Sequence, residues 1–164
     1  MSVLPRRPFR LTSVLLATAL AGTAGCSAGG SGSRPVPTPS AQAAGFCRAL
    51  HERLPRTLDG LERDSAGPDS DFAADWGDPA VQLRCGVERP ELLTPGSEHY
   101  NPTAEAVEVD GVTWLLEKQD DGYRFTTTGR KAFVEVTVPG KYAPETGVLT
   151  EFAAPVEKTV PSEL

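Results

Sequence analysis

Residues 104–138 alternate between apolar and polar side chains and are interrupted by three turns that contain glycine. Asp110-Gly111 strongly indicates a two-residue hairpin, because glycine accepts the positive φ that a type I′ turn requires. Asp121-Gly122 and Gly129-Arg130 mark the two further turns. Since successive side chains of a strand point to opposite faces, this pattern predicts an antiparallel β-meander with one buried face.

Pairing the strands across these turns places the apolar residues on one face. That face carries Val107, Val109, Val112, Trp114, Leu116, Tyr123, Phe125, Thr127, Ala132, Val134, Val136 and Val138. We expect Trp114 to lie beside Val107, and Phe125 to pair near Val134. The opposite face carries Glu108, Thr113, Glu117, Arg124, Thr126, Glu135 and Thr137, with Leu115 and Phe133 as its apolar residues. Leu115 and Phe133 therefore mark a possible binding face.

Two short stretches with helical spacing flank the meander. They are Phe46, Cys47, Leu50 and Leu54 before Pro55, and Val148, Leu149, Phe152 and Ala153 before Pro155. We expect Pro55 to end or kink the first helix and Pro155 to end the second, because proline lacks a backbone donor. Residues 59–79 are acidic and predict a solvated loop, and residues 80–87 are the first strand candidate. The predicted fold class is α+β, an antiparallel β-meander of four to five strands with a short helix at each end of the domain.

The N-terminus has the features of an export signal. Residues 1–25 contain Arg6, Arg7 and Arg10, followed by the uncharged run LTSVLLATALAGTAG. A basic start, a short apolar middle and small residues at the end are typical of a secretory signal peptide. The run is shorter than the about 20 residues that a membrane span needs. The motif RRPF at positions 6–9 leaves both twin-arginine and general export open.

Cys26 is the predicted lipid attachment site. Thr23-Ala24-Gly25-Cys26 resembles a lipobox, in which the cysteine thiol accepts a diacylglycerol and becomes the new N-terminus. Thr23 departs from the leucine usual at that position, so a cut after Ala21 without lipidation is the alternative. Two acyl chains suffice for stable anchoring. The sequence thus predicts an extracytoplasmic protein on the outer face of the cell membrane, attached through a diacylglycerol on Cys26.

The mature chain divides into a tether and one domain. Residues 26–43 are rich in Gly, Ser and Pro and predict a flexible tether, and residues 44–164 predict a single domain. The formal net charge of the whole chain is −6, and removal of the basic signal peptide makes the chain more acidic. An acidic surface repels phosphates, so nucleic acid is not an expected partner.

Cys47 and Cys85 remain once Cys26 is acylated. Outside the cytoplasm an even number of cysteines favours a disulfide, which would join the first helix to the first strand. A zinc site made of these two cysteines, His51 and His99 is the alternative. It lacks the close CxxC-type spacing that is usual for structural zinc sites.

No motif for catalysis or cofactor binding stands out. Ser97-Glu98-His99 contains three residue types of a catalytic triad, but triads are assembled from distant segments. The sequence lacks a P-loop and a GxGxxG motif, and its one GxSxG pattern, Gly25 to Gly29, lies at the predicted lipobox and tether. Asp69-Ser70-Asp71 lacks the ligand order of an EF-hand. We therefore expect no catalytic residues, no cofactor and no bound metal.

Four segments resemble one protein family. FCRALHERLP (46–55), WGDPAVQLRCGV (76–87), VEVDGVTWLLE (107–117) and AFVEVTVPGKYAPETGVL (132–149) are similar to the DUF3515 family of uncharacterised actinobacterial lipoproteins. The resemblance implies export, membrane attachment and an envelope setting, and it implies no catalytic residues. The predicted function is a non-catalytic accessory or binding module of undefined ligand, with a possible envelope protein partner. An enzyme or substrate-binding subunit acting on cell-wall precursors is the alternative.

Overall fold

The computed structural model describes residues 34–163, so the predicted signal peptide and Cys26 lie outside the described residues. The described chain contains two α-helices, a six-stranded antiparallel sheet and a separate two-stranded sheet. The prediction of an α+β fold is therefore confirmed. None of the helices in this part of the chain is long and apolar enough to cross a bilayer.

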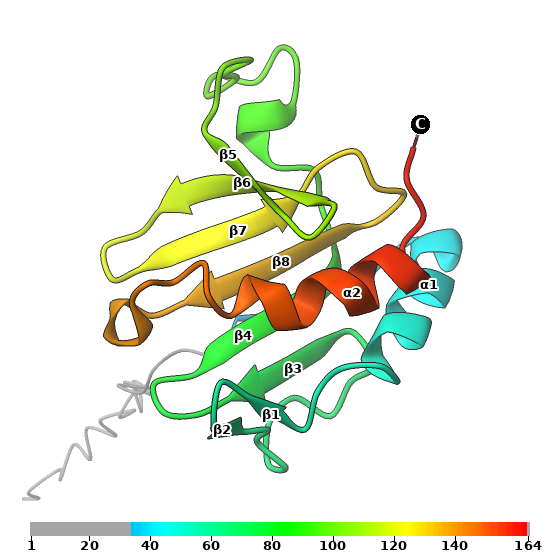
Figure 1. Cartoon of the computed structure of the whole chain (residues 1–164). Coiled ribbons are helices and arrows are strands. Elements are labelled where there is room, and N and C mark those ends of the chain that lie inside the picture. Colours follow the sequence, from blue (N-terminus) through cyan, green and yellow to red (C-terminus); the bar gives the residue numbers. More distant parts are fainter. Residues whose placement is uncertain (1–33, 164) are drawn as a thin grey trace, which may run out of the picture.

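Figure 1 shows the arrangement of the elements along the chain. They are α1 (Ala41–His51), β1 (Thr57–Leu58), β2 (Leu61–Glu62), β3 (Ala73–Trp76), β4 (Val81–Val87), the short 3₁₀ helix η1 (Glu91–Leu93), β5 (Ala106–Val109), β6 (Val112–Lys118), β7 (Tyr123–Thr127), β8 (Phe133–Val138), the 3₁₀ helix η2 (Gly140–Tyr142) and α2 (Leu149–Thr159). The strand order in the large sheet is β3-β4-β8-β7-β6-β5.

The large sheet has six strands, where the sequence predicted four to five. Strands β5 to β8 form a meander, β4 pairs with β8, and β3 adds to β4 at the edge. Because β2 and β3 lie within residues 59–79, the prediction of a solvated loop there is wrong for these two strands. Residues 64–72 do form a loop, and all of them are exposed or partly buried. All four residues of β3 are buried, and the ring centroid of Trp76 lies 5.3 Å from that of Phe152 in α2. Packing of this tryptophan into the core explains why an otherwise acidic segment contributes a strand.

Asp110-Gly111 forms the hairpin turn between β5 and β6. The two residues have φ values of 46° and 81°. Two successive positive φ angles are the requirement of a type I′ turn, whose twist matches that of the flanking strands. The turn places Val107 opposite Trp114, as expected.

The same alternation of faces continues through β7 and β8. Phe125 lies opposite Val136 rather than Val134, so the predicted pair is wrong, but both valines point to the same face. The buried residues of this face are Val112, Trp114, Phe125, Thr127, Ala132, Val134, Val136 and Val138. Val107, Val109, Leu116 and Tyr123 are partly buried against them. The predicted apolar face is therefore the core face of the sheet.

The two helices help to bury this face. Figure 1 shows α2 crossing in front of the sheet, with α1 beside its C-terminal end. The helices contact each other, and α1 also contacts β4. Ser40 caps α1 by accepting a hydrogen bond from the Ala43 backbone N–H at 3.3 Å. Because α1 begins at Ala41, the folded unit starts before the predicted boundary at Ala44.

Helix α2 continues through Pro155 to Thr159, so the prediction that it ends at Pro155 is wrong. An internal proline costs about 3 kcal/mol, because it removes a donor and crowds the preceding turn. Val156 and Val160 lie beyond it and are both 0% exposed. Burial of one such side chain contributes roughly 1.5–3 kcal/mol. Packing beyond the proline therefore offsets its local cost.

Cys47 of α1 and Cys85 of β4 form the predicted disulfide, with their Cα atoms 5.5 Å apart. The bridge joins the first helix to the core face of the sheet. Since each sulfur is bonded to the other, the alternative zinc site with His51 and His99 is wrong. Arg63 instead donates from Nη2 to His51 Nε2 at 2.9 Å. Burial, with the nearby Arg63 charge, lowers the pKa of His51 and favours its neutral form.

Candidate functional site

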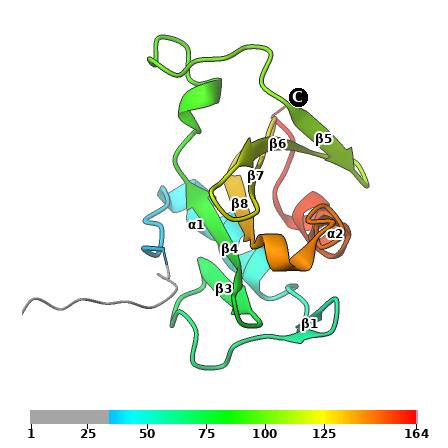
Figure 2. The same cartoon turned by 90° about the vertical axis from the view of Figure 1, so that its left-hand side faces the viewer.

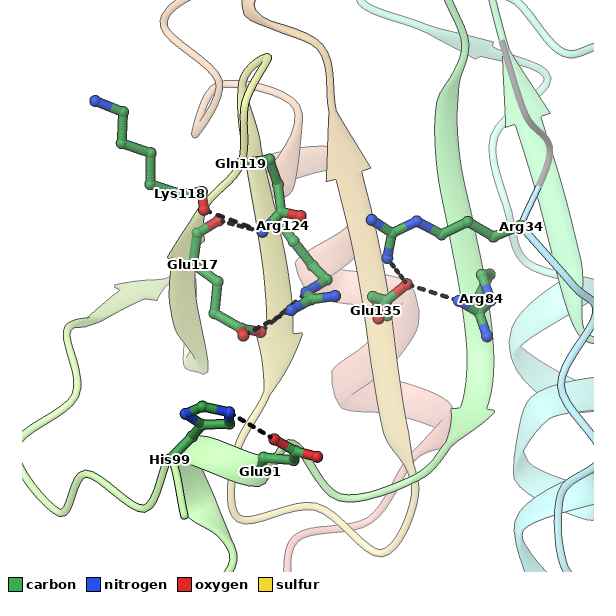
Figure 3. Close-up of polar contacts among 9 residues, drawn as sticks. All are labelled: Arg34, Arg84, Glu91, His99, Glu117, Lys118, Gln119, Arg124 and Glu135. Carbon is green, nitrogen blue, oxygen red and sulfur yellow. Dashed lines mark hydrogen bonds and ion pairs between the residues drawn. The ribbon is translucent and has the colours of Figure 1, made fainter. Parts of the chain in front are cut away.

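The polar face of the sheet carries a row of alternating charges. Glu117 on β6, Arg124 on β7, Glu135 on β8 and Arg84 on β4 lie on successive strands. The register places Glu117 opposite Arg124, and Glu135 opposite Arg84. Figure 3 shows these side chains in front of the strands, with Glu135 between Arg124 and Arg84 and α2 on the far side. We call these four residues the charge row.

Short ion pairs connect the members of the charge row. Arg124 donates from Nε to Glu117 Oε2 at 3.0 Å and from Nη2 to Oε1 at 2.7 Å. Arg84 donates from Nη1 to Glu135 Oε1 at 3.1 Å. The Glu135 and Glu117 side chains are only 10% and 14% exposed. Partly buried pairs of this kind are screened by salt much less than surface pairs.

The charge row keeps Arg124 ionised. Its hydrogen bond to Glu117 raises the pKa of Arg124, and burial opposes this rise. The negative charges of Glu117 and Glu135 raise the pKa further. Arg124 therefore stays a cation at physiological pH, so that the row presents fixed charges of both signs.

A cleft lies between the sheet and the segment that connects β4 to β5. Figure 2 shows η1, which belongs to this segment, and α2 toward opposite sides of the sheet. The cleft has a volume of about 520 Å³. Its floor is Glu117, Arg124, Thr126 and Glu135, and its wall is Val87, Glu88, Arg89, Pro90, Glu91, Leu92 and His99. Ligand sites typically have volumes of about 300–1,000 Å³, so the cleft is large enough for a small ligand.

The predicted binding face at Leu115 and Phe133 is corrected by the structure. Leu115 is only 1% exposed, so it cannot belong to an exposed apolar surface. The segment between β4 and β5 lies on this side of the sheet (Figure 2), and alternation along a strand cannot predict such a cover. Phe133 is partly buried, and the Arg89 guanidinium lies 5.2 Å from its ring centroid. This cation–π contact places Phe133 behind a wall residue of the cleft.

The N-terminal part of the described chain packs beside the cleft. Residues 34–39, which we call the strap, bring Arg34 Nη1 within 3.2 Å of Glu135 Oε1. Pro37 in the middle of the strap is buried. A Cβ at Gly86 would lie 2.4 Å from a side-chain carbon of the strap, so the close approach requires glycine. Part of the predicted flexible tether is therefore packed against the sheet.

The Ser97-Glu98-His99 sequence forms a local turn and not a catalytic relay. Ser97 Oγ accepts a hydrogen bond from the backbone N–H of His99 at 3.1 Å, and not from its ring. The His99 ring reaches the wall of the cleft, where its Nε2 lies 3.7 Å from Glu91 Oε2. Both side chains are largely exposed, at 66% and 72%. An ion pair this open to water contributes little to stability.

A second depression lies at the β3 side of the sheet and is lined by Asp64, Asp75 and Asp78. Burial raises the pKa of Asp75, and the Gln82 side chain opposes the rise. Within residues 34–163, no group of three or more His, Cys, Asp or Glu side chains is placed to hold a metal ion. The acidic residues 69–71 therefore do not form part of a group of metal-binding side chains in the described part of the chain.

The sequence placed three members of the charge row on the polar face without identifying them as a site. The available signal was the opposite charge of Glu117 and Arg124 across the predicted hairpin. Arg84 could not be added, because it is separated from Glu135 by 51 residues and joins it only when β4 pairs with β8. Arg34 is 101 residues from the same carboxylate, and no pattern in the sequence connects them.

The comparisons with known proteins bear on the whole of this domain. The family model described as "Protein of unknown function (DUF3515)" matches residues 8–164. No curated protein and no solved structure matches the chain. The matched range includes the charge row, the cleft, the strap and both cysteines of the disulfide. The chain therefore belongs to the DUF3515 family.

Proposed function

We propose that this protein is a membrane-anchored binding protein of the cell envelope, and that its ligand site is the cleft above the charge row. The observation that carries this proposal is the cleft itself, whose floor is made of charges held in place by ion pairs. A site that is ordered before its ligand arrives loses little conformational entropy on binding.

Ion pairs fix the positions of the two floor carboxylates, which supports a binding role for the cleft. Glu117 is held by two hydrogen bonds from Arg124, and Glu135 by one each from Arg84 and Arg34. Both carboxylates are therefore held in place before a ligand arrives, which suits them to recognise it.

The strap relates the cleft to the proposed lipid anchor at Cys26. If Cys26 is acylated, only residues 27–33 separate it from the strap. Seven residues span at most about 25 Å, however they are arranged. Because the strap contacts Glu135 in the floor of the cleft, the chain would leave the domain on the side where the cleft lies. The anchor would thus hold the cleft close to the membrane surface.

A position-specific crosslinking experiment in intact cells tests the proposed function. A photoreactive amino acid is placed at Leu92 in the cleft wall and, as a control, at the exposed Glu62 in β2. We expect a crosslinked product from position 92 that is not formed from position 62, and mass spectrometry then identifies it. Identical products from both positions, or no product from position 92, would exclude the cleft as the ligand site.

A further inference from the structure

The two edges of the large sheet differ in how their outer backbone groups are satisfied. Strand β3 forms one edge, and the segment that follows β2 runs along it. Asp64 N–H donates to Asp75 O at 2.8 Å, and Gly77 N–H donates to Glu62 O at 3.2 Å. Strand β5 forms the other edge, the upper one in Figure 1, and no strand of the described chain lies beyond it. The outer side of β5 is therefore the open edge of the sheet.

The bonding of β5 to β6 shows which of its backbone groups are free. Leu116 N–H donates to Glu105 O at 2.8 Å, just before β5 begins. Bonded residues alternate along an antiparallel pair, so every second residue from Glu105 bonds to β6, and Ala106 and Glu108 point their backbone groups outward. Both residues are exposed, and neither backbone forms a hydrogen bond with another residue among 34–163. Two N–H and two C=O groups are thus available to one further strand.

An edge of this kind can accept a strand from another chain. An extended peptide that pairs with an exposed edge gains main-chain hydrogen bonds, and its alternate side chains give specificity. On the core side of the sheet, the added strand would lie beside Val107 and Val109, which are only partly buried. Because successive side chains alternate between faces, apolar residues at every second position of the added strand would extend the core.

The charge around β5 favours a basic strand. Residues 90–117 contain six Asp or Glu residues and no Lys or Arg. Glu105, Glu108 and Asp110 are exposed, and none of them forms an ion pair with another described residue. Opposite charges on directly paired strand residues attract each other, and like charges repel. The acidic edge therefore disfavours pairing with a second copy of itself and favours a lysine or arginine opposite Glu108.

We propose that β5 binds an extended segment of a partner protein in which basic and apolar residues alternate. The segment pairs antiparallel with β5, and its basic residues lie opposite Ala106 and Glu108 and form the main-chain hydrogen bonds. An apolar residue of the segment lies opposite Val107 on the core side of the sheet. No residue that lines the cleft belongs to β5, so this is a second interaction surface beyond the proposed function.

Amide hydrogen exchange of the full-length chain in detergent tests the open edge. The amides of Ala106 and Glu108 should exchange much faster than those of Val107 and Val109, because only the latter two are bonded to β6. Equal protection of all four amides would show that the edge is not open. Protection of Ala106 and Glu108 that rises with protein concentration would assign the edge to a second copy. Either result would overturn the proposal.

Capped hexapeptides test the chemistry of the partner. Acetyl-KVKVKT-amide should slow exchange at Ala106 and Glu108, and it should bind at least about tenfold more tightly than acetyl-EVEVET-amide. In the antiparallel arrangement, the lysine N–H groups of the peptide point toward β5 and the valine N–H groups point away. Methylation of the lysine backbone nitrogens should therefore weaken binding at least about tenfold. Methylation of the valine backbone nitrogens should change it little.

Two variants and one matched control locate the contact. Glu108→Lys should reverse the preference, so that EVEVET binds more tightly than KVKVKT. Ala106→Pro removes an outward N–H group that is not bonded to β6, and proline is tolerated on the outer side of an edge strand. It should weaken KVKVKT binding several-fold. Glu62→Lys makes the same charge change at an exposed site in β2 and should leave binding unchanged.

Three results of the peptide experiments would overturn the proposal. Equal affinities of KVKVKT and EVEVET would show that charge does not select the partner. Equal binding of the two methylated peptides would show that β5 does not pair through its backbone. An equal effect of Glu108→Lys and Glu62→Lys would place the contact elsewhere. The crosslinking at position 92 does not involve β5, so the proposed function is judged separately.

Discussion

Loss of the Cys47–Cys85 bridge should remove a large part of the free energy of unfolding of this domain. The two cysteines are separated by 38 residues. The chain-entropy relation for a loop of this length gives about 3.9 kcal/mol at 25 °C. Domains are typically stable by only about 5–15 kcal/mol. The double variant Cys47→Ala/Cys85→Ala should therefore unfold at a temperature about 10–20 °C lower than the wild type.

Urea unfolding followed by tryptophan fluorescence measures this loss. Trp76 and Trp114 are both 0% exposed, so their emission reports exposure of the core. Linear extrapolation of the transition gives the free energy of unfolding in water. Each single variant, Cys47→Ala or Cys85→Ala, already breaks the bond. All three variants should therefore lose similar amounts, and the single losses should not add.

Two results would refute this reasoning. A double variant within about 1 kcal/mol of the wild type would mean that the bridge contributes far less than the loop-closure relation requires. Additive losses from the single variants would mean that the buried sulfur atoms, and not the covalent bond, carry the effect. As a control, a reducing agent should destabilise the wild type and leave the double variant unchanged.

Three further predictions follow from burial, the N-terminal motif and one titrating group. Leu115→Ala should destabilise the domain by about 2–5 kcal/mol, because its side chain is buried. This loss is comparable with the about 3–5 kcal/mol expected for Trp114→Ala. A urea midpoint that moves only for Trp114→Ala would contradict this prediction. Cys26→Ala should move the protein from the membrane fraction to the medium, since the acyl acceptor is lost, and a variant that still pellets would exclude the anchor. Burial raises the pKa of Asp75 in the folded protein above its ordinary value of 3.8. Folding therefore favours the protonated side chain, and this contribution to the free energy of unfolding is present at low pH and is lost as the pH rises through the folded-state pKa. Between about pH 3 and pH 7 the wild type should therefore lose stability relative to Asp75→Asn, and parallel stability curves would rule this out.

Local chemistry was sufficient to predict the core face of the meander. The Asp110-Gly111 turn requires positive φ at both residues, and the structure has 46° and 81° there. Once that turn is set, strict alternation assigns every residue of the neighbouring strands to one face or the other. The disulfide was predictable from the even number of domain cysteines and the predicted export. Each of these inferences depends on residues close in sequence or on simple counting.

The candidate site depends on contacts that the sequence does not encode locally. The Arg84–Glu135 pair forms only when β4 joins β8, and Arg34 reaches Glu135 from the strap. Leu115 is buried although alternation assigns it to the polar face, and α2 passes Pro155 because the residues beyond it pack into the core. Turn preference and alternation are properties of neighbouring residues. The free energy of burying segments that are far apart in the chain determines which strand completes the sheet and what covers its polar face. These contacts exist only in the tertiary structure, so the sequence pattern does not reveal them.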